Sequence, residues 1–341
     1  MKMPLVTVGI PVYKRLRFLP EAVQSVAAQD YPNIELIVSD NGVNGTAIPE
    51  LVGQYYKRPY RFRQNPSTIN ATLHYNQIVH EATGDYVVLL GDDDAISPNF
   101  VSDLLGVVQR HPDIIVAIPK QEQMDEEGRT FRASSDSVPE LLSGEEFIKA
   151  WCRGTYGWLT FSTVLMKTSE VRRCGGFVVI PTGNGDEDAL LIKMALDHSI
   201  GVSARSTVRK RQYPTSLGYS CSYPELTDAA RHFIRFLDTD EILRDYAKRN
   251  IGQWRELRGL IVEMLWKMCY GRWKDLYRSR LSFLQWAAVS LSMPWIPAYY
   301  STVGQTLWDE SKLAVFTSMK CRFPWLKKLS RSLHEVRVKR Q

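Results

Sequence analysis

The sequence has few cysteines, and none of them is arranged as a redox or metal-binding pair. Its five cysteines, Cys152, Cys174, Cys221, Cys269 and Cys321, are odd in number and never spaced as C-x-x-C. Such a set argues against a disulfide framework and against a zinc site. We therefore expect a protein of a reducing compartment.

Long apolar runs, internal repeats and low-complexity tracts are also missing. The N-terminus lacks the apolar stretch and small-residue cleavage site of a signal peptide, which predicts a cytoplasmic catalytic part. The least polar window, residues 284–300, has 17 residues and contains Pro294 and Pro297. It is shorter than the ~20 residues that a spanning helix needs, so we expect no membrane crossing there.

Charge is divided unevenly along the 341 residues. Residues 1–227 carry 22 Lys and Arg against 26 Asp and Glu, a net charge of −4, whereas residues 228–341 carry 21 against 11, a net charge of +10. Seven of the nine tryptophans also lie in the second segment. We predict a catalytic domain at residues 1–227 and a basic, Trp-rich region at residues 228–341, where helical patterns dominate.

Short apolar runs alternate with helical patterns over the first 118 residues. Strands are expected at residues 5–12, 34–38, 85–90 and 114–118, and helices after Pro20, over 71–82 and over 99–110. This alternation indicates a mostly parallel sheet covered by helices on both faces. Such sheets bind ligands at the carboxyl ends of their strands, where Tyr13, Asp40 and Asp92–Asp94 fall.

The pattern is less regular from residue 119 to residue 227. The polar stretch 119–142 predicts a loop or hairpin over the sheet edge, and Ser143 with Glu146 predicts a capping box that begins a helix. A strand over 159–166, a turn at 173–177 and a helix over 188–196 should follow.

Two groups of acidic residues are candidates for chemistry. Asp92, Asp93 and Asp94 follow a buried strand directly, and adjacent carboxylates repel one another unless a cation or solvent offsets their charge. Mn²⁺ or Mg²⁺ suits them because these ions take oxygen ligands and add water and substrate phosphates. The alternative is a solvated acidic turn.

The second group, Asp186-Glu187-Asp188, stands at the start of a helix. These carboxylates either favour the positive end of the helix dipole or supply a base that takes a proton from a hydroxyl.

The order of the motifs resembles family 2 glycosyltransferases with the GT-A fold, over roughly residues 4–220. The motifs are Ile10-Pro11-Val12-Tyr13, Ser25-Val26-Ala27-Ala28-Gln29, Leu36-Ile37-Val38-Ser39-Asp40-Asn41-Gly42, Gly84-Asp85-Tyr86 before the acidic run, Gly175-Gly176-Phe177 and Asp186-Glu187-Asp188. The resemblance implies a Rossmann-like α/β domain with a nucleotide-sugar-binding half at about 1–118, an acceptor-binding half at 119–227 and an α-helical C-terminal extension.

The resemblance also implies roles for individual residues. Pro11 and Tyr13 match the exit of the first strand beside the nucleoside, and Asp40 matches the acidic residue that binds the base. Gly91 takes the first acidic position of the aspartate motif. This leaves Asp93 as the best match to the metal-binding aspartate, with Asp94 as a second metal ligand and Asp92 near the ribose and diphosphate.

The position of the catalytic base stays open between two residues. Counting back from Lys193 favours Glu187, whereas the literal Glu-Asp pair gives Asp188. Asn70 stands where the family commonly has glycine, which argues against nucleotide contacts from residues 65–70. Arg209, Lys210 and Arg211 either add positive charge near the diphosphate or form a solvated basic turn.

The implied activity is inverting, metal-dependent hexosyl transfer. A sugar would pass from a nucleotide-sugar, with a UDP-sugar as the preferred donor, to a hydroxyl of a glycan or lipid-linked acceptor. The pathway would be bacterial surface polysaccharide biosynthesis, and the cofactor would be Mn²⁺ or Mg²⁺. No nucleic-acid partner is expected. The basic C-terminal region would place the protein peripherally on the inner face of the cytoplasmic membrane, or would be a helical bundle with a tryptophan core.

Two other functions compete with this interpretation. A nucleic-acid-binding or scaffold protein would use the basic aromatic C-terminal region on phosphates. A nucleotidyltransferase would also bind nucleotide-sugars, but the Gly-rich N-terminal loop of such enzymes is missing.

Overall fold

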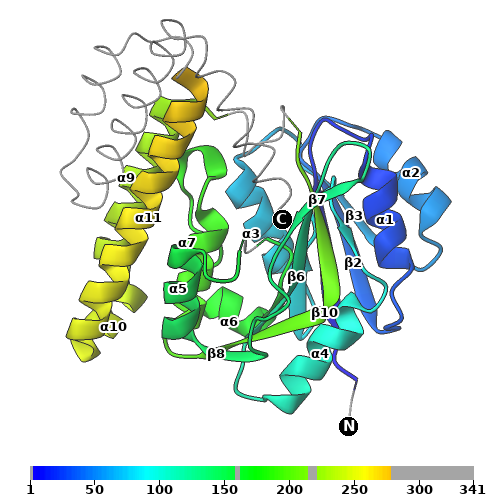
Figure 1. Ribbon diagram of the computed structural model, residues 1–341. Helices are drawn as coiled ribbons and strands as arrows, with labels where there is room; N and C mark the ends of the chain where they lie inside the picture. The colour runs from blue at the N-terminus through cyan, green and yellow to red at the C-terminus, as the bar shows by residue number, and fades with distance from the viewer. Residues whose placement is uncertain (1–2, 158–161, 214–220, 278–341) are drawn as a thin grey trace, which may run out of the picture. The chain divides into compact units, whose positions relative to one another are not determined.

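A computed structural model describes residues 3–157, 162–213 and 221–277 (Figure 1). The strands in these residues are β1 (Val6–Val12), β2 (Ile34–Asp40), β3 (Arg61–Gln64), β4 (Tyr86–Leu89), β5 (Ala95–Ile96), β6 (Val116–Met124), β7 (Thr130–Ala133), β8 (Leu141–Ser143), β9 (Leu165–Lys167) and β10 (Ser199–Arg211). The α-helices are α1 (Leu19–Ala27), α2 (Ala47–Tyr55), α3 (Ala71–Glu81), α4 (Phe100–Arg110), α5 (Gly144–Arg153), α6 (Thr168–Arg173), α7 (Asp186–Ala195), α9 (Tyr223–Thr239), α10 (Glu241–Arg249) and α11 (Ile251–Tyr277).

The strands form one mixed sheet in the order β3-β2-β1-β4-β9-β6-β10-β5, with β7 paired to β6 and β8 to β10. β1 runs parallel to both β2 and β4, with Val6 opposite Ile34 and Tyr86. The carboxyl ends of these strands therefore meet at one edge. The expected parallel arrangement holds in this half, whereas β9 runs antiparallel to both β4 and β6.

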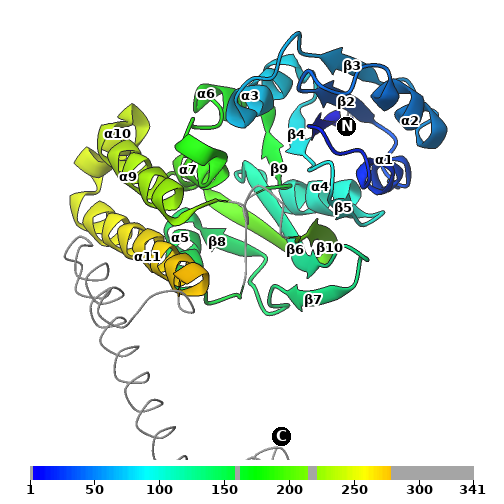
Figure 2. The same cartoon turned by 90° about the horizontal axis from the view of Figure 1, so that it is seen from above.

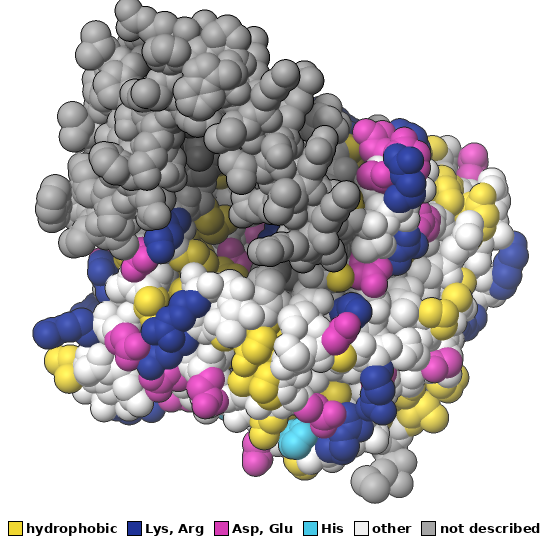
Figure 3. Space-filling view, viewed as in Figure 1, with side chains coloured by type: hydrophobic (Ala, Val, Ile, Leu, Met, Phe, Trp, Pro, Cys, Tyr) yellow, Lys and Arg dark blue, Asp and Glu magenta, His cyan; other side chains and the backbone are white. Residues whose placement is uncertain are grey.

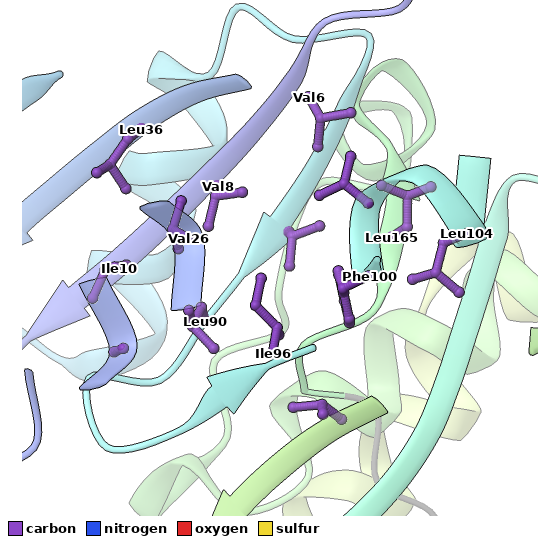
Figure 4. Packing of buried hydrophobic residues seen from close by; sticks show 14 of the residues in the cluster. Val6, Val8, Ile10, Val26, Leu36, Leu90, Ile96, Phe100, Leu104 and Leu165 are labelled. Atoms are coloured by element: carbon purple, nitrogen blue, oxygen red, sulfur yellow. The ribbon is translucent and has the colours of Figure 1, made fainter. Parts of the chain in front are cut away.

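Helices cover both faces of the sheet, with α1, α2 and α4 on one side and α3, α6 and α7 on the other (Figure 2). Because β1 lies between these layers, all four of its valine and isoleucine side chains that face α1 are fully buried. They are Val6, Val8, Ile10 and Val12. Figure 4 shows the packing of this core, in which Val26 of α1 and Phe100 and Leu104 of α4 join the strand residues.

The structure contains several of the elements that the sequence predicts between residues 119 and 227. Ser143 and Glu146 form the expected capping box at the start of α5, and the stretch 119–142 contains the β6–β7 hairpin. The helical region begins earlier than residue 228, because Ser222 and Glu225 form a second capping box at the start of α9. The strand expected over 159–166 is the short β9, and residues 158–161 lie outside the described residues.

Contacts group the chain into two units, Met1–Leu265 and Trp266–Gln341. α9, α10 and the first part of α11 belong to the first unit. The division after residue 227 stays a prediction based on composition. The predictions for the Trp-rich region concern mainly residues outside the described part, although Trp254 and Trp266 on α11 are described and buried.

The described surface carries mixed charge. On the face seen in Figure 3, Lys and Arg side chains are interspersed with Asp and Glu. Of the helices in the described part of the chain, none has the length and apolar character that crossing a bilayer requires.

Candidate active site

A cleft of about 450 Å³ opens where the chain leaves β1, β2 and β4. This is the edge at which α/β sheets of this type bind ligands. The cleft is lined by Pro11, Val12, Tyr13, Lys14, Arg15, Asn41, Thr68, Ile69, Ala71, His74, Tyr75, Gly91, Asp92, Asp93 and Tyr213. Four of the five residues predicted to bind the nucleotide-sugar are among them, and the fifth, Asp40, is not.

A second hollow of about 510 Å³ lies at the opposite edge of the sheet, beside Gly84 and Lys167. Its charged residues hold the fold together. Asp85 accepts a hydrogen bond from the backbone of Leu5, and the Arg172 guanidinium donates to carbonyls at the end of α3. The cleft at the carboxyl ends is therefore the candidate site.

The acidic run forms a tight turn after β4, closed by a hydrogen bond from the Asp94 amide to the Gly91 carbonyl. Oδ2 of Asp92 accepts a hydrogen bond from the Tyr13 amide at 3.2 Å. Burial, followed by the charge of Asp93, raises the pKa of Asp92 well above its usual value. The same two causes raise the pKa of Asp94 to about 7. The run is thus a crowded, partly desolvated anionic site rather than a solvated turn.

The second acidic group lies in the first turn of α7. Asp186 is 3% exposed. Its carboxylate accepts hydrogen bonds from the Thr72 hydroxyl at 2.8 Å and from the Glu187 amide at 2.9 Å. Asp186 therefore anchors α7 to α3, and its neighbours Glu187 and Asp188 are the ones left for chemistry.

Electrostatic effects show that the two acidic groups share one site. Glu187 contributes to the raised pKa of Asp94, which lies on the acidic run. Tyr75, on the cleft wall, has its pKa raised by burial, next by Glu187 and Asp186, and then by Asp92 and Asp93. Because charges act strongly only over short distances, Tyr75 lies within electrostatic range of both groups.

Glu187 and Asp188 face different surroundings, because successive helical residues point about 100° apart. Glu187 accepts a hydrogen bond from the Ser162 side chain and lies close to Tyr75. Asp188 has a pKa raised to about 7 by burial and by Glu187, and its charge raises the pKa of the Cys152 thiol of α5.

The end of β10 also belongs to this site. Arg209, Lys210 and Arg211 are the last residues of the strand, and Lys210 and Arg211 are 8% and 4% exposed. The alternative of a solvated basic turn is therefore wrong for these two residues. The positive charge of Lys210 opposes the rise in pKa of Asp94, Glu187 and Asp188, which places its ammonium group among them.

The Gly-Gly-Phe motif joins the segment after α6 to α3. The Asn76 side chain donates to the Phe177 carbonyl at 2.9 Å and accepts from the Phe177 amide at 2.8 Å. Gly176 has a φ of +77°, and a Cβ there would lie 2.3 Å from Asn76 Oδ1. Only glycine allows this close approach, which explains the motif.

The loop of residues 65–70 forms one wall of the cleft, through Thr68 and Ile69. Asn41 holds it: its Oδ1 accepts from the Ile69 amide at 3.0 Å, and its Nδ2 donates to the Ile69 carbonyl at 2.9 Å. Asn70, which argued against a nucleotide-binding role for this loop, is the N-cap of α3 and accepts from the Thr72 and Leu73 amides. The packing of this loop on Asn41 is a contact between separate segments, so the local sequence pattern could not predict it.

Asp40 is fully buried and is not among the residues that line the cleft. Its carboxylate accepts hydrogen bonds at 3.0 Å from the Asn44 amide, the Asn44 side chain and the Gln64 side chain. These contacts tie the turn after β2 to the end of β3. The base-binding role of Asp40 stays a prediction.

His74 lies on the cleft wall with its Nε2 2.7 Å from the Ser39 hydroxyl. Burial, followed by the charge of Arg63, lowers the pKa of His74 to about 4. An unfolded histidine has a pKa of about 6.5, so between these values the unfolded chain binds the extra proton. Stability should therefore fall as the pH falls through this window.

We expect that the free energy of unfolding falls by about 2 kcal/mol more between pH 7 and pH 5 in the wild type than in His74→Gln. Urea denaturation at both pH values measures this. His80→Gln, on the exposed side of the same helix, is the matched control and should keep the wild-type pH dependence. Equal pH dependence of the wild type and His74→Gln would contradict the prediction.

Comparison with known families agrees with this geometry. The sequence model of glycosyl transferase family 2 matches residues 7–166. This part of the chain belongs to that family. The match includes β1, the acidic run and β9, and it ends before the acidic start of α7. The predicted family is therefore confirmed, and with it the enzyme class of the domain.

Curated relatives resemble this family 2 domain over part of their length. The putative glycosyltransferase EpsE of Bacillus subtilis is 27% identical over 179 residues, which is 51% of this chain and 60% of EpsE. An uncharacterized glycosyltransferase of Rickettsia conorii is 33% identical over 140 residues, 39% of this chain and 22% of that protein. The chain thus spans less than two thirds of either relative.

Solved structures show the fold. The S. aureus TarS fragment 1–349 in complex with UDP-GlcNAc has a TM-score of 0.57 at 16% identity, covering 76% of this chain and 81% of the fragment. The mannosyltransferase PcManGT from Pyrobaculum calidifontis, in complex with GDP-Man and Mn²⁺, has a TM-score of 0.51 at 14% identity, covering 90% of this chain and 88% of its own. The predicted GT-A fold is confirmed.

Proposed function

We propose that this family 2 domain transfers a sugar from a nucleotide-sugar to an acceptor hydroxyl with inversion at the anomeric carbon. The observation that carries the proposal is that Tyr75, on the wall of the cleft beside Asp92 and Asp93, is acted on by the charges of both the acidic run and the start of α7. The acidic run suits the diphosphate end of a donor when a cation is bound, and the acidic start of α7 suits the acceptance of a proton.

We propose a UDP-sugar as the donor, bound by Pro11, Tyr13, Asp92 and Asp93 along the cleft and by Asp40 at its base. The structure of TarS with UDP-GlcNAc supports this choice. Because PcManGT was solved with GDP-Man, GDP-sugars are the first alternative donors to compare with UDP-sugars. Screening UDP-, GDP- and dTDP-sugars for turnover with Mn²⁺ tests the function. No turnover or binding of any of them would contradict it.

The acidic run fits a divalent cation bound with the help of the donor. In the part of the chain that the structure describes, no three His, Cys, Asp or Glu side chains are grouped to hold a metal ion by themselves. However, Asp93 Oδ1 and Asp94 Oδ2 lie 3.1 and 3.0 Å from the point that a Cβ on Gly91 would take. Two oxygens therefore face one space, and Mg²⁺-type sites need only one or two carboxylates besides water and phosphates. Bound there, Mn²⁺ or Mg²⁺ would stabilise the charge of the leaving diphosphate.

We assign the base to Glu187. It lies towards Tyr75 and the acidic run, whereas Asp188 lies towards α5. Glu187 would take the proton of the acceptor hydroxyl. The oxygen would then form its bond to the anomeric carbon as the bond from that carbon to the diphosphate breaks on the opposite face, which inverts the configuration. Ser162 would hold the Glu187 carboxylate through its hydrogen bond.

Lys14 and Arg15 bring positive charge to the otherwise acidic cleft, and a diphosphate is the part of the donor that needs it. We expect Lys14→Gln to weaken UDP binding about tenfold, which is the effect of one charge-assisted hydrogen bond. Uridine binding should not change. Isothermal titration with UDP and with uridine measures both, and Lys57→Gln, far from the cleft lining, is the matched control. Equal losses for UDP and uridine would contradict a phosphate contact.

For the acceptor, we propose a glycan or lipid-linked hydroxyl in bacterial surface polysaccharide synthesis. We further propose that the protein works at the inner face of the cytoplasmic membrane, with the basic region 228–341 as the contact. The net charge of +10 over those residues supports attraction to anionic lipids.

A further inference from the structure

The last residue of β10, Arg211, and Tyr213 just after the strand hold the acidic run, which lies more than a hundred residues earlier in the chain. The Arg211 amide donates to Asp94 Oδ1 at 2.9 Å, and its Nε donates to the Asp93 carbonyl at 3.1 Å. The Tyr213 hydroxyl donates to Asp93 Oδ2 at 2.6 Å. One oxygen of each carboxylate is thereby engaged.

The other oxygen of each carboxylate is the one that faces Gly91. Asp93 Oδ1 and Asp94 Oδ2 are the atoms near the missing Cβ, and neither is the atom that β10 engages. Gly91 itself lines the cleft. The hydrogen bonds from Arg211 and Tyr213 therefore divide the four carboxylate oxygens into two that accept these bonds and two that lie near the same space beside Gly91.

Tyr213 is fixed before any ligand binds. Its ring packs at a tilt against Phe18, with centroids 5.7 Å apart, and the Arg15 guanidinium lies 5.2 Å from its centroid. Arg211 covers the same Phe18 ring at 4.3 Å. Further contacts hold Arg211, whose Nη1 donates to the carbonyls of Asp125 and Glu126. The Tyr213 ring is thus held by Phe18 and Arg15, and Phe18 is itself covered by Arg211.

We propose that Tyr213 is a positioning residue for the divalent cation, because its hydrogen bond to Oδ2 of Asp93 keeps Oδ1 turned towards the space beside Gly91. The inference rests on the metal-dependent function proposed above. Groups that hydrogen-bond to metal ligands typically change metal affinity by about 10- to 100-fold when they are removed.

The test is Mn²⁺ binding to the full chain in the presence of UDP, followed by the paramagnetic resonance signal of free Mn²⁺. In Tyr213→Phe, which keeps the ring packing, we expect Mn²⁺ to bind at least about tenfold more weakly. UDP binding without metal should equal that of the wild type. In turnover, the Mn²⁺ concentration for half-maximal rate should rise while kcat at saturating Mn²⁺ changes little.

Tyr60→Phe is the matched control, because it removes one tyrosine hydrogen bond, to the Pro49 carbonyl, away from the cleft lining. Its Mn²⁺ affinity should equal that of the wild type. Both variants are compared at a temperature where circular dichroism shows them folded.

Two results would overturn the inference: unchanged or tighter Mn²⁺ binding in Tyr213→Phe, or an equal loss of Mn²⁺ binding and of metal-free UDP binding. A wild-type chain that binds neither UDP nor Mn²⁺ would instead overturn the proposed function itself. Gly91→Ala gives a second approach, since its Cβ would enter the same space. It should weaken Mn²⁺ binding and leave metal-free UDP binding intact.

Discussion

Glu187→Gln is expected to lower the rate of sugar transfer by about 10²- to 10⁴-fold, because an amide cannot accept the proton of the acceptor hydroxyl. The change keeps the size of the side chain and a hydrogen-bond partner for Ser162. Donor binding should therefore remain. Single-turnover transfer to acceptor and UDP titration measure the two effects separately.

Asp188→Asn is the matched comparison for this prediction, since it neutralises the next residue of the same helix. Because Asp188 faces Cys152 and α5, its variant should keep most of the transfer rate. If Asp188→Asn is the slower of the two, the base is Asp188. If both variants transfer at the wild-type rate, the acceptor is activated by another group.

Asp93→Asn is expected to reduce donor turnover by about 10²- to 10³-fold, the usual effect of removing one preorganised charge-stabilising group. The variant should fold, since the amide can still accept the Tyr213 hydrogen bond. Excess chelator should reduce wild-type turnover similarly, and Mn²⁺ should restore it. Turnover of a UDP-sugar with and without chelator measures both.

The control for Asp93→Asn is Asp113→Asn, which changes an exposed carboxylate that does not line the cleft. It should turn over donor at the wild-type rate. Full wild-type activity in excess chelator would contradict the metal requirement. Sugar transfer without a metal would then be tested with the Glu187 variants.

Much of the first 118 residues could be predicted from local patterns. β1, β2 and β4 are continuous apolar runs, and α1, α3 and α4 repeat apolar residues at helical spacing, so each element carries its own signal. The carboxyl-end rule then placed Tyr13 and the acidic run at one edge. Short elements such as α2, β3 and β5 have weaker patterns and were not predicted.

β10 shows why the rest could not be predicted. Its last residues, Arg209-Lys210-Arg211, have the composition of an exposed turn, and only strand pairing with β6 and β5 places them in the sheet, where Lys210 and Arg211 are buried. Charged residues are buried when partners compensate them, and those partners come from distant parts of the chain. The partners of Arg211 include the Asp93 carbonyl, 118 residues away.

The sequence by itself determined the family, the order of the elements and the two acidic groups, because these depend on residue types and spacing along the chain. Tertiary structure alone decided that Asp186 is an anchor, that the charge of Glu187 acts on Tyr75 while that of Asp188 acts on Cys152 of α5, and that Asp40 is fully buried outside the cleft lining. The same holds for the acidic run, whose oxygens are divided between β10 and the space beside Gly91. The physical reason is that the direction of a side chain and its hydrogen-bond partners depend on contacts between segments, which no local pattern contains.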